Sequence, residues 1–83
     1  MEIDKTAALK ALGFLVRKHR ERLHISQEDL ATRSNLDRTY ISGIERGVRN
    51  PSLTAILSLA NGLGVNTSDL LENLESQIKK FNE

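Results

Sequence analysis

The side chains best suited to chemistry lie between residues 38 and 49 of the 83-residue chain, and most of them are hydrogen-bond donors. The guanidinium of Arg38 can donate two parallel hydrogen bonds to the acceptor pair on the major-groove edge of a guanine. Thr39 offers a hydroxyl for a base or a phosphate and a methyl group for a thymine. These residue types predict a surface that reads base edges. The expected base-reading residues are Arg38, Thr39, Tyr40, Ser42, Arg46 and Arg49.

A second group of donors suits phosphates rather than bases. Gln27 follows Ser26 at the start of a predicted helix, where free backbone amides and the helix dipole favour an anion. Asn50 can donate to a phosphate from a loop, or it can serve only to form the turn before Pro51. Gln27 likewise has the simpler alternative of completing a helix cap. The expected phosphate-binding residues are Gln27, Asn50 and Arg17.

Apolar residues recur at spacings of three and four along most of the chain, which predicts helices rather than strands. Five helices are expected, at residues 5–22, 27–33, 38–46, 53–63 and 68–80. Ser26 and Asp29 form a capping-box pattern before the second helix, and Asn35 suits a left-handed residue after it. Asp37 is a suitable N-cap for the third. The fold class is therefore all-α, in one domain over residues 1–83.

The second and third predicted helices are joined by a tight turn, and two short helices joined in this way form a helix-turn-helix. The third helix turns Ile41 and Ile44 inward, which leaves the donors outside, where a helix can enter the major groove. Gly43 is expected on that outer face, where the missing side chain would let the backbone come close to a base pair.

The stretch from Ser26 to Pro51 resembles the helix-turn-helix domain of lambda and 434 repressors and Cro, in the xenobiotic-response-element branch. The resemblance covers roughly residues 12–72 and implies a five-helix lambda-repressor-like DNA-binding domain. It also implies a partly buried, structural ion pair between Arg20 and Glu45. Asn35 stands where that family usually has Gly. The matching residues are Arg20, Ser26, Gln27, Leu30, Ala31, Ile41, Ser42, Ile44, Glu45, Gly47 and Pro51.

A narrower resemblance rests on the run from Ser34 to Arg46, continued by Arg49 and Asn50. This run is similar to the controller proteins of restriction-modification systems. The resemblance implies a dimeric transcriptional regulator that binds palindromic operators upstream of its own gene and the endonuclease gene. It further implies activation at low occupancy and self-repression at high occupancy. The implied partners are double-stranded DNA, a second copy of the chain and RNA polymerase.

Composition excludes several other classes. The chain has no Cys and only two His, His19 and His24, which lie five residues apart without neighbouring ligands, so neither a thiolate site nor a metal site is expected. No Ser/His/Asp arrangement is visible, and a chain of this length has little room for a substrate pocket, so no enzyme, cofactor or small-molecule ligand is expected. No apolar run approaches a membrane span, and the N-terminus does not resemble a signal peptide, so a cytoplasmic location is expected.

Charge and apolar spacing divide the chain into two parts. Residues 1–50 carry ten Lys and Arg against seven Asp and Glu, whereas residues 51–83 carry two against four. The basic part suits a polyanion. Residues 68–83, the last helix and tail, are expected to serve as a dimerisation element, either docked on the first helix or shared with a second copy, with Leu70 folded inward. The expected interface residues are Val65, Asn66, Leu71, Leu74, Ile78 and Phe81.

Two alternatives remain at this point. The first is a phage or plasmid repressor, or an antitoxin, of the same fold, which gene neighbourhood would distinguish from a controller. The second is a protein-interaction adaptor that does not bind DNA, because a fold does not by itself imply a function. An adaptor would lack a steep loss of duplex affinity with salt.

Overall fold

The structure is a computed structural model that describes residues 2–83, and within them the regular elements are six α-helices. Their bounds are α1 Lys5–Arg22, α2 Gln27–Ser34, α3 Arg38–Glu45, α4 Leu53–Gly62, α5 Thr67–Leu70 and α6 Leu74–Phe81. The all-α fold class is confirmed, and the first four helices lie where the apolar spacing predicts them. The fifth predicted helix, over residues 68–80, is divided into α5 and α6.

The division falls at Asn73, whose φ of 65° is left-handed. A residue in that conformation cannot continue a right-handed helix, so the chain turns before α6 begins. The prediction of one continuous helix was wrong because the apolar spacing from Leu71 to Phe81 is uninterrupted and no Gly or Pro marks the turn.

Local capping signals set the ends of α2. The Ser26 hydroxyl accepts from the Asp29 amide at 3.0 Å, and the Asp29 carboxylate accepts from the Ser26 amide at 3.0 Å, which completes the predicted capping box. Asn35 adopts the predicted left-handed conformation, with a φ of 55°. Asp37 occupies the N-cap position of α3 without making a side-chain cap bond, and its carboxylate accepts from the Thr39 hydroxyl at 2.6 Å.

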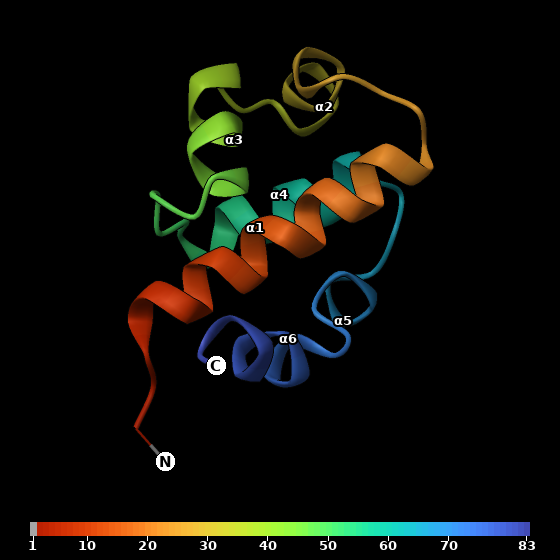
Figure 1. Cartoon of the computed structure of the whole chain (residues 1–83). Helices are drawn as coiled ribbons and strands as arrows, with labels where there is room; N and C mark the ends of the chain where they lie inside the picture. The colour runs from red at the N-terminus through yellow and green to blue at the C-terminus, as the bar shows by residue number, and fades with distance from the viewer. Residues whose placement is uncertain (1) are drawn as a thin grey trace.

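One apolar core joins the helices. Figure 1 shows α1 crossing the molecule, with α2 and α3 on one side of it and α5 and α6 on the other. Leu70 is fully buried, as predicted, whereas Leu23 is exposed after the end of α1. The core is made by Leu12, Val16, Leu30, Ala31, Ile41, Ile44, Leu59, Ala60, Leu63 and Leu70.

The contact between α1 and α3 depends on a glycine. Gly13 is buried, and a Cβ atom placed on it would overlap the backbone carbonyl oxygen of Ile44. The missing side chain therefore allows the two helix backbones to approach each other closely. This packing fixes the position of α3, the helix that carries most of the predicted donors.

Candidate nucleic-acid interface

A hydrogen-bonded cluster holds the helix-turn-helix together from the inside. Arg20 of α1 donates from Nε to Oε2 of Glu45 at 2.7 Å and from Nη2 to Oε1 at 3.0 Å. Its third nitrogen, Nη1, donates to the carbonyl oxygen of Ile25 at 2.8 Å. Gln27 donates from Nε2 to Glu45 Oε1 at 3.0 Å. The one carboxylate of Glu45 therefore ties α1, α2 and α3 together.

The charged groups of this cluster are largely shielded from solvent, unlike those of a surface ion pair. The side chains of Arg20 and Glu45 are only 13% and 4% exposed. The hydrogen bonds that Arg20 donates to Glu45 raise the pKa of Arg20 above its usual value, against the opposing effect of burial. The ion pair that the resemblance implies is thus present, and its two-pronged geometry fixes the end of α3 against α1.

The start of α3 presents two of the predicted base-reading residues to solvent. Arg38 is exposed, and its guanidinium forms no ion pair with any residue between 2 and 83. Thr39 is also exposed, and its hydroxyl donates to Asp37, so its oxygen can accept but has no second hydrogen to donate. A free guanidinium at the N-terminal end of a helix can reach base edges in the major groove.

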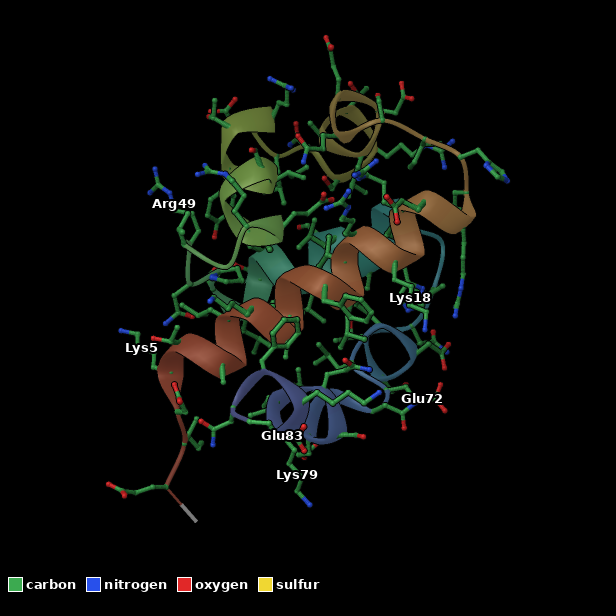
Figure 2. The ribbon with its side chains drawn as sticks, in the orientation of Figure 1. Lys5, Lys18, Arg49, Glu72, Lys79 and Glu83 are labelled. Atoms are coloured by element: carbon green, nitrogen blue, oxygen red, sulfur yellow. The ribbon has the colours of Figure 1, made fainter. Side chains whose placement is uncertain are left out.

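The end of α3 and the following loop supply the other arginines. Arg46 and Arg49 are both exposed, and Figure 2 shows Arg49 projecting outward beside the loop that follows α3. The Nε of Arg46 lies 3.4 Å from the hydroxyl of half-buried Ser42, which orients this guanidinium along the helix. Together with Arg38, these side chains place cationic donors at both ends of α3.

Gly43 has a different role from the one predicted. It is buried, and a Cβ atom on it would overlap the side chain of Arg49. The amides of Val48 and Arg49 both donate to the Gly43 carbonyl oxygen, at 3.0 and 3.2 Å, so the loop folds back over this residue. Gly43 therefore makes room for the stem of Arg49 and does not offer bare backbone to a base pair.

Tyr40 is placed less favourably for base reading than predicted. The residue is half-buried and packs against the apolar core. The sequence did not predict this packing, because the helical spacing of Ile41 and Ile44 does not determine whether Tyr40 lies on the inner or the outer face of α3. It lies at the border of the exposed face of α3, beside Arg38 and Thr39.

The three predicted phosphate-binding residues lie in different surroundings. Gln27 is half-buried and bonded to Glu45, and the capping box leaves the backbone amides of Gln27 and Glu28 available to an anion. Asn50 is exposed in the loop before α4. Arg17 is exposed on α1 and forms an ion pair with Glu21, Nε to Oε2, at 3.1 Å. Any phosphate bound by Arg17 would therefore compete with that carboxylate.

Comparison with known proteins places this geometry in a family. Residues 16–70 match the helix-turn-helix family, and this stretch contains α2, α3 and the Arg20–Glu45 pair. The chain belongs to the helix-turn-helix family. The control protein C.MunI of a Mycoplasma species is 40% identical over 63 residues, which are 76% of this chain and 85% of that protein.

Solved structures of helix-turn-helix controllers agree with the fold. The restriction-modification controller C.Esp1396I has a TM-score of 0.79 and 42% identity, over 87% of this chain and 95% of that one. The controller C.AhdI from Aeromonas hydrophila has a TM-score of 0.73 and 45% identity, over 75% and 94%. These matches confirm the narrower resemblance, so within the helix-turn-helix family the chain belongs to the restriction-modification controllers. C.Esp1396I has also been solved as a tetramer on its natural 35 base-pair operator.

Five of the six predicted dimer residues of this helix-turn-helix chain pack on other parts of the same chain, and the sixth, Asn66, is exposed. Val65 and Leu71 are half-buried and pack on the core cluster. α6, which carries Leu74 and Ile78, packs along α1, and both residues are half-buried. Phe81 meets Phe14 of α1 edge-on, with ring centroids 6.2 Å apart and the Lys18 amine 5.9 Å from the centre of the Phe14 ring.

Within residues 2–83, His, Cys, Asp and Glu side chains form no group of three that could hold a metal ion. None of the helices in this part of the chain is both long enough and apolar enough to cross a membrane.

Proposed function

We propose that this controller binds a palindromic operator as a homodimer and regulates its own gene together with the endonuclease gene of a restriction-modification system. The observation that carries the proposal is a set of exposed arginines at both ends of α3, without ion-pair partners among residues 2–83, on a helix that the Arg20–Glu45–Gln27 cluster holds in place. Such a helix needs no reordering to bind, so little conformational entropy is lost. Its role is recognition rather than catalysis.

Base reading is assigned to α3. Arg38 donates to a guanine, and Thr39 contacts a thymine methyl, or a phosphate once its hydroxyl leaves Asp37. Tyr40 and Ser42 contribute from the border of the same face. Arg46 and Arg49 reach a base or a phosphate from the end of the helix. The solved structures of C.Esp1396I include variants of an arginine, a threonine and a tyrosine that are consecutive in that protein. The same three residue types stand here in the same order, which supports this assignment.

Phosphate binding is assigned to the start of α2 and to the loop before α4. The Gln27 side chain is held by Glu45 through one hydrogen of its amide, and the second hydrogen can be donated to a phosphate. Because Glu45 is the last residue of α3, a phosphate contact by Gln27 sets the depth of α3 in the groove. Asn50 and Arg17 add phosphate contacts on either side of Gln27. The expected location of the protein is the cytoplasm, where the operator lies.

Selection from a pool of random duplexes, with the purified full chain at a stated salt concentration, tests the proposal. We expect a palindromic consensus and an affinity that falls steeply as salt rises, because bound cations are released from the phosphates. Failure to enrich any duplex would favour the protein-interaction adaptor. A palindrome found beside no methyltransferase or endonuclease gene would favour a phage or plasmid repressor or an antitoxin.

A matched pair of variants separates recognition from net charge. The double variant Arg38→Ala, Arg49→Ala and the double variant Lys79→Ala, Lys80→Ala each remove two positive charges. Figure 2 shows Arg49 and Lys79 on opposite sides of α1. The arginine variant is expected to lose at least about tenfold in affinity for the selected duplex. If the lysine variant lost as much, affinity would follow overall charge, and the assignment to α3 would be wrong.

A further inference from the structure

A groove crosses α1 between the end of α3 and the end of α6. Figure 1 shows α3 and α6 on opposite sides of α1, so this groove connects the recognition helix with the last helix of the chain. Its cavity has a volume of about 260 Å³ and is lined by Lys10, Phe14, Arg17, Glu45, Arg46 and Phe81. We call it the Phe14–Phe81 groove.

The floor of the groove is a pair of aromatic rings that is only partly covered. Phe14 is 40% exposed and Phe81 is 43% exposed, although the two rings meet edge-on. Moving such apolar surface from water onto a partner is favourable by roughly 25 cal/mol per Å². Aromatic side chains are also enriched in protein–protein interfaces. The pair is therefore suited to receive an apolar side chain of another molecule.

Three cationic side chains surround these rings. Lys10, Arg17 and Arg46 are all exposed, and among residues 2–83 only Arg17 has an ion-pair partner. The one carboxylate of the lining, Glu45, is 4% exposed and accepts from Arg20 at both of its oxygens. Its charge is therefore balanced inside the protein. The groove is cationic, although the whole chain has a formal net charge of only +1.

Cations around apolar rings are complementary to an acidic peptide that also carries an apolar side chain. That side chain covers Phe14 and Phe81, and the carboxylates accept paired hydrogen bonds from Arg17 or Arg46. Clusters of arginines are a recurring means of recognising acidic motifs. Small-molecule pockets are roughly 300–1,000 Å³, so a cavity of about 260 Å³ is better suited to single side chains of an extended peptide.

A DNA backbone fits this surface less well. Phosphates would satisfy the guanidinium groups of Arg17 and Arg46. Protein–DNA interfaces are, however, more polar than protein–protein interfaces, so phosphates alone would leave the two phenyl rings without an apolar partner.

We infer that the Phe14–Phe81 groove binds an acidic peptide segment of a partner protein, with an apolar side chain of that segment seated on the two rings. Arg17 and Arg46 are also assigned to the operator, so such a partner competes with DNA for both guanidinium groups. The acidic partner is therefore an antagonist of operator binding. The competition rests on the proposed operator contacts, whereas the binding of the peptide does not.

Nuclear magnetic resonance titration of the isotope-labelled full chain, without DNA, tests the binding itself. The probe is the acetylated and amidated peptide Asp-Asp-Leu-Phe-Asp-Leu-Asp. We expect the signals of Lys10, Phe14 and Arg46 to shift and those of Arg38 to stay in place. One control peptide has Ser in place of Leu and Phe, and a second has Asn in place of Asp. Each control is expected to bind at least about tenfold more weakly, because each lacks one of the two kinds of contact.

A matched pair of double variants locates the site. Lys10→Glu, Arg17→Glu reverses two charges at the groove. Lys79→Glu, Lys80→Glu makes the same change on α6, where both lysines are exposed and Figure 2 shows Lys79 projecting away from α1. The groove variant is expected to bind the peptide at least about tenfold more weakly, because like charges then face each other. The α6 variant is expected to bind it like the parent. Thermal melting checks both folds, and the control peptides decide the question if the groove variant does not fold.

Four results would each overturn the peptide site. They are an absence of shifts at millimolar peptide, a serine control peptide that binds as tightly as the probe, and an equal loss in both double variants. The fourth is a set of groove signals that moves with protein concentration alone, because a second copy would then fill the groove.

Duplex binding in the presence of the peptide tests the competition. The probe is expected to lower the affinity for the selected duplex, and the serine control peptide at the same concentration is expected to lower it less. A duplex that binds equally well with and without saturating probe would overturn the competition. Failure of the chain to bind any duplex would refute the proposed function, whereas the titration without DNA would still decide whether the groove binds the peptide.

Discussion

Arg20 and Glu45 lie 25 residues apart in the sequence and share two hydrogen bonds, of 2.7 and 3.0 Å. Because Glu45 ends α3 and Arg20 lies in the last turn of α1, this pair joins the recognition helix to the longest helix of the domain. The angle at which α3 meets a duplex is therefore set from inside the protein, before any contact with DNA.

Removing one member of this pair is expected to destabilise the domain strongly. Glu45→Ala leaves the mostly buried guanidinium of Arg20 without its carboxylate and should cost about 3–5 kcal/mol of unfolding free energy. The matched control is Glu21→Ala, which breaks the exposed pair with Arg17 and should cost less than about 1 kcal/mol. Urea denaturation measures both values. A Glu45→Ala protein that unfolds at the parent's urea concentration would contradict the structural role.

Arg38→Ala is expected to weaken operator binding without affecting the fold, because its exposed guanidinium makes no ion pair within residues 2–83. The loss should be about 1–3 kcal/mol and should relax the preference at one position of each half-site. Titration of duplexes with single base changes measures this effect. An unchanged preference at every position would show that Arg38 contacts phosphate only.

Gly13 and Gly43 are expected to respond in opposite ways to the same substitution. Gly13→Ala drives a methyl group into the backbone of Ile44, which cannot move without separating α1 from α3, so we expect a loss of roughly 1–3 kcal/mol in stability. Gly43→Ala meets only the movable side chain of Arg49, and alanine favours a helix by roughly 1 kcal/mol. The Gly43→Ala protein should therefore be at least as stable as the parent, whereas its affinity for the operator should fall.

Thermal melting and duplex binding, measured together, separate these two glycines. For Gly43→Ala, the affinity should fall to about that of Arg49→Ala, because both changes remove the same guanidinium from its position. If Gly43→Ala instead bound like the parent, the position of Arg49 would not matter for recognition.

Stability is expected to depend on the protonation of His19. Burial, followed by the nearby charge of Arg22, lowers the pKa of His19 below 6.5, although a backbone hydrogen bond with Asp69 opposes the shift. The folded protein therefore holds this proton less tightly than the unfolded chain does. The contribution of neutral His19 to the free energy of unfolding is therefore fully present above pH 6.5, and it is lost as the pH falls from 6.5 through the lowered pKa.

The melting temperature should consequently fall less between pH 7.5 and 5 in His19→Gln than in the parent. Both proteins are compared in buffers of equal ionic strength, because the cavity of about 270 Å³ around His19 is also lined by Lys18, Arg22 and Glu72. Parallel melting curves for the two proteins over this range would rule out a contribution from His19.

Local signals allowed much of the fold to be predicted from the sequence. The capping box of Ser26 and Asp29 and the turn at Asn35 depend on neighbours within a few residues, so both were readable in advance. The Arg20–Glu45 pair is different, because its members are distant in sequence and no spacing rule joins them. It was expected only because the motif around it resembles a known family.

The features that were missed depend on tertiary contacts. Nothing near Asn73 in the sequence distinguishes it from an asparagine inside a helix, and the bond between Gln27 and Glu45 requires α2 and α3 to be packed together. Gly43 was read as an open position because the loop that carries Arg49 back over it could not be placed. Base contacts and the dimer surface stay predictions, since both involve a second molecule.

The turn at Asn73 has an evolutionary consequence. Without it, α5 and α6 would form one rod over residues 67–81, roughly 22 Å long, that extends away from the domain. Phe81 would then leave Phe14, and the face of α1 that α6 now covers would be open to the same helix of a neighbouring copy. A single substitution at residue 73 that favours a continuous helix would thus let α6 pack on α1 of a neighbouring copy instead of on its own α1. Such an exchange of one helix between copies is domain swapping.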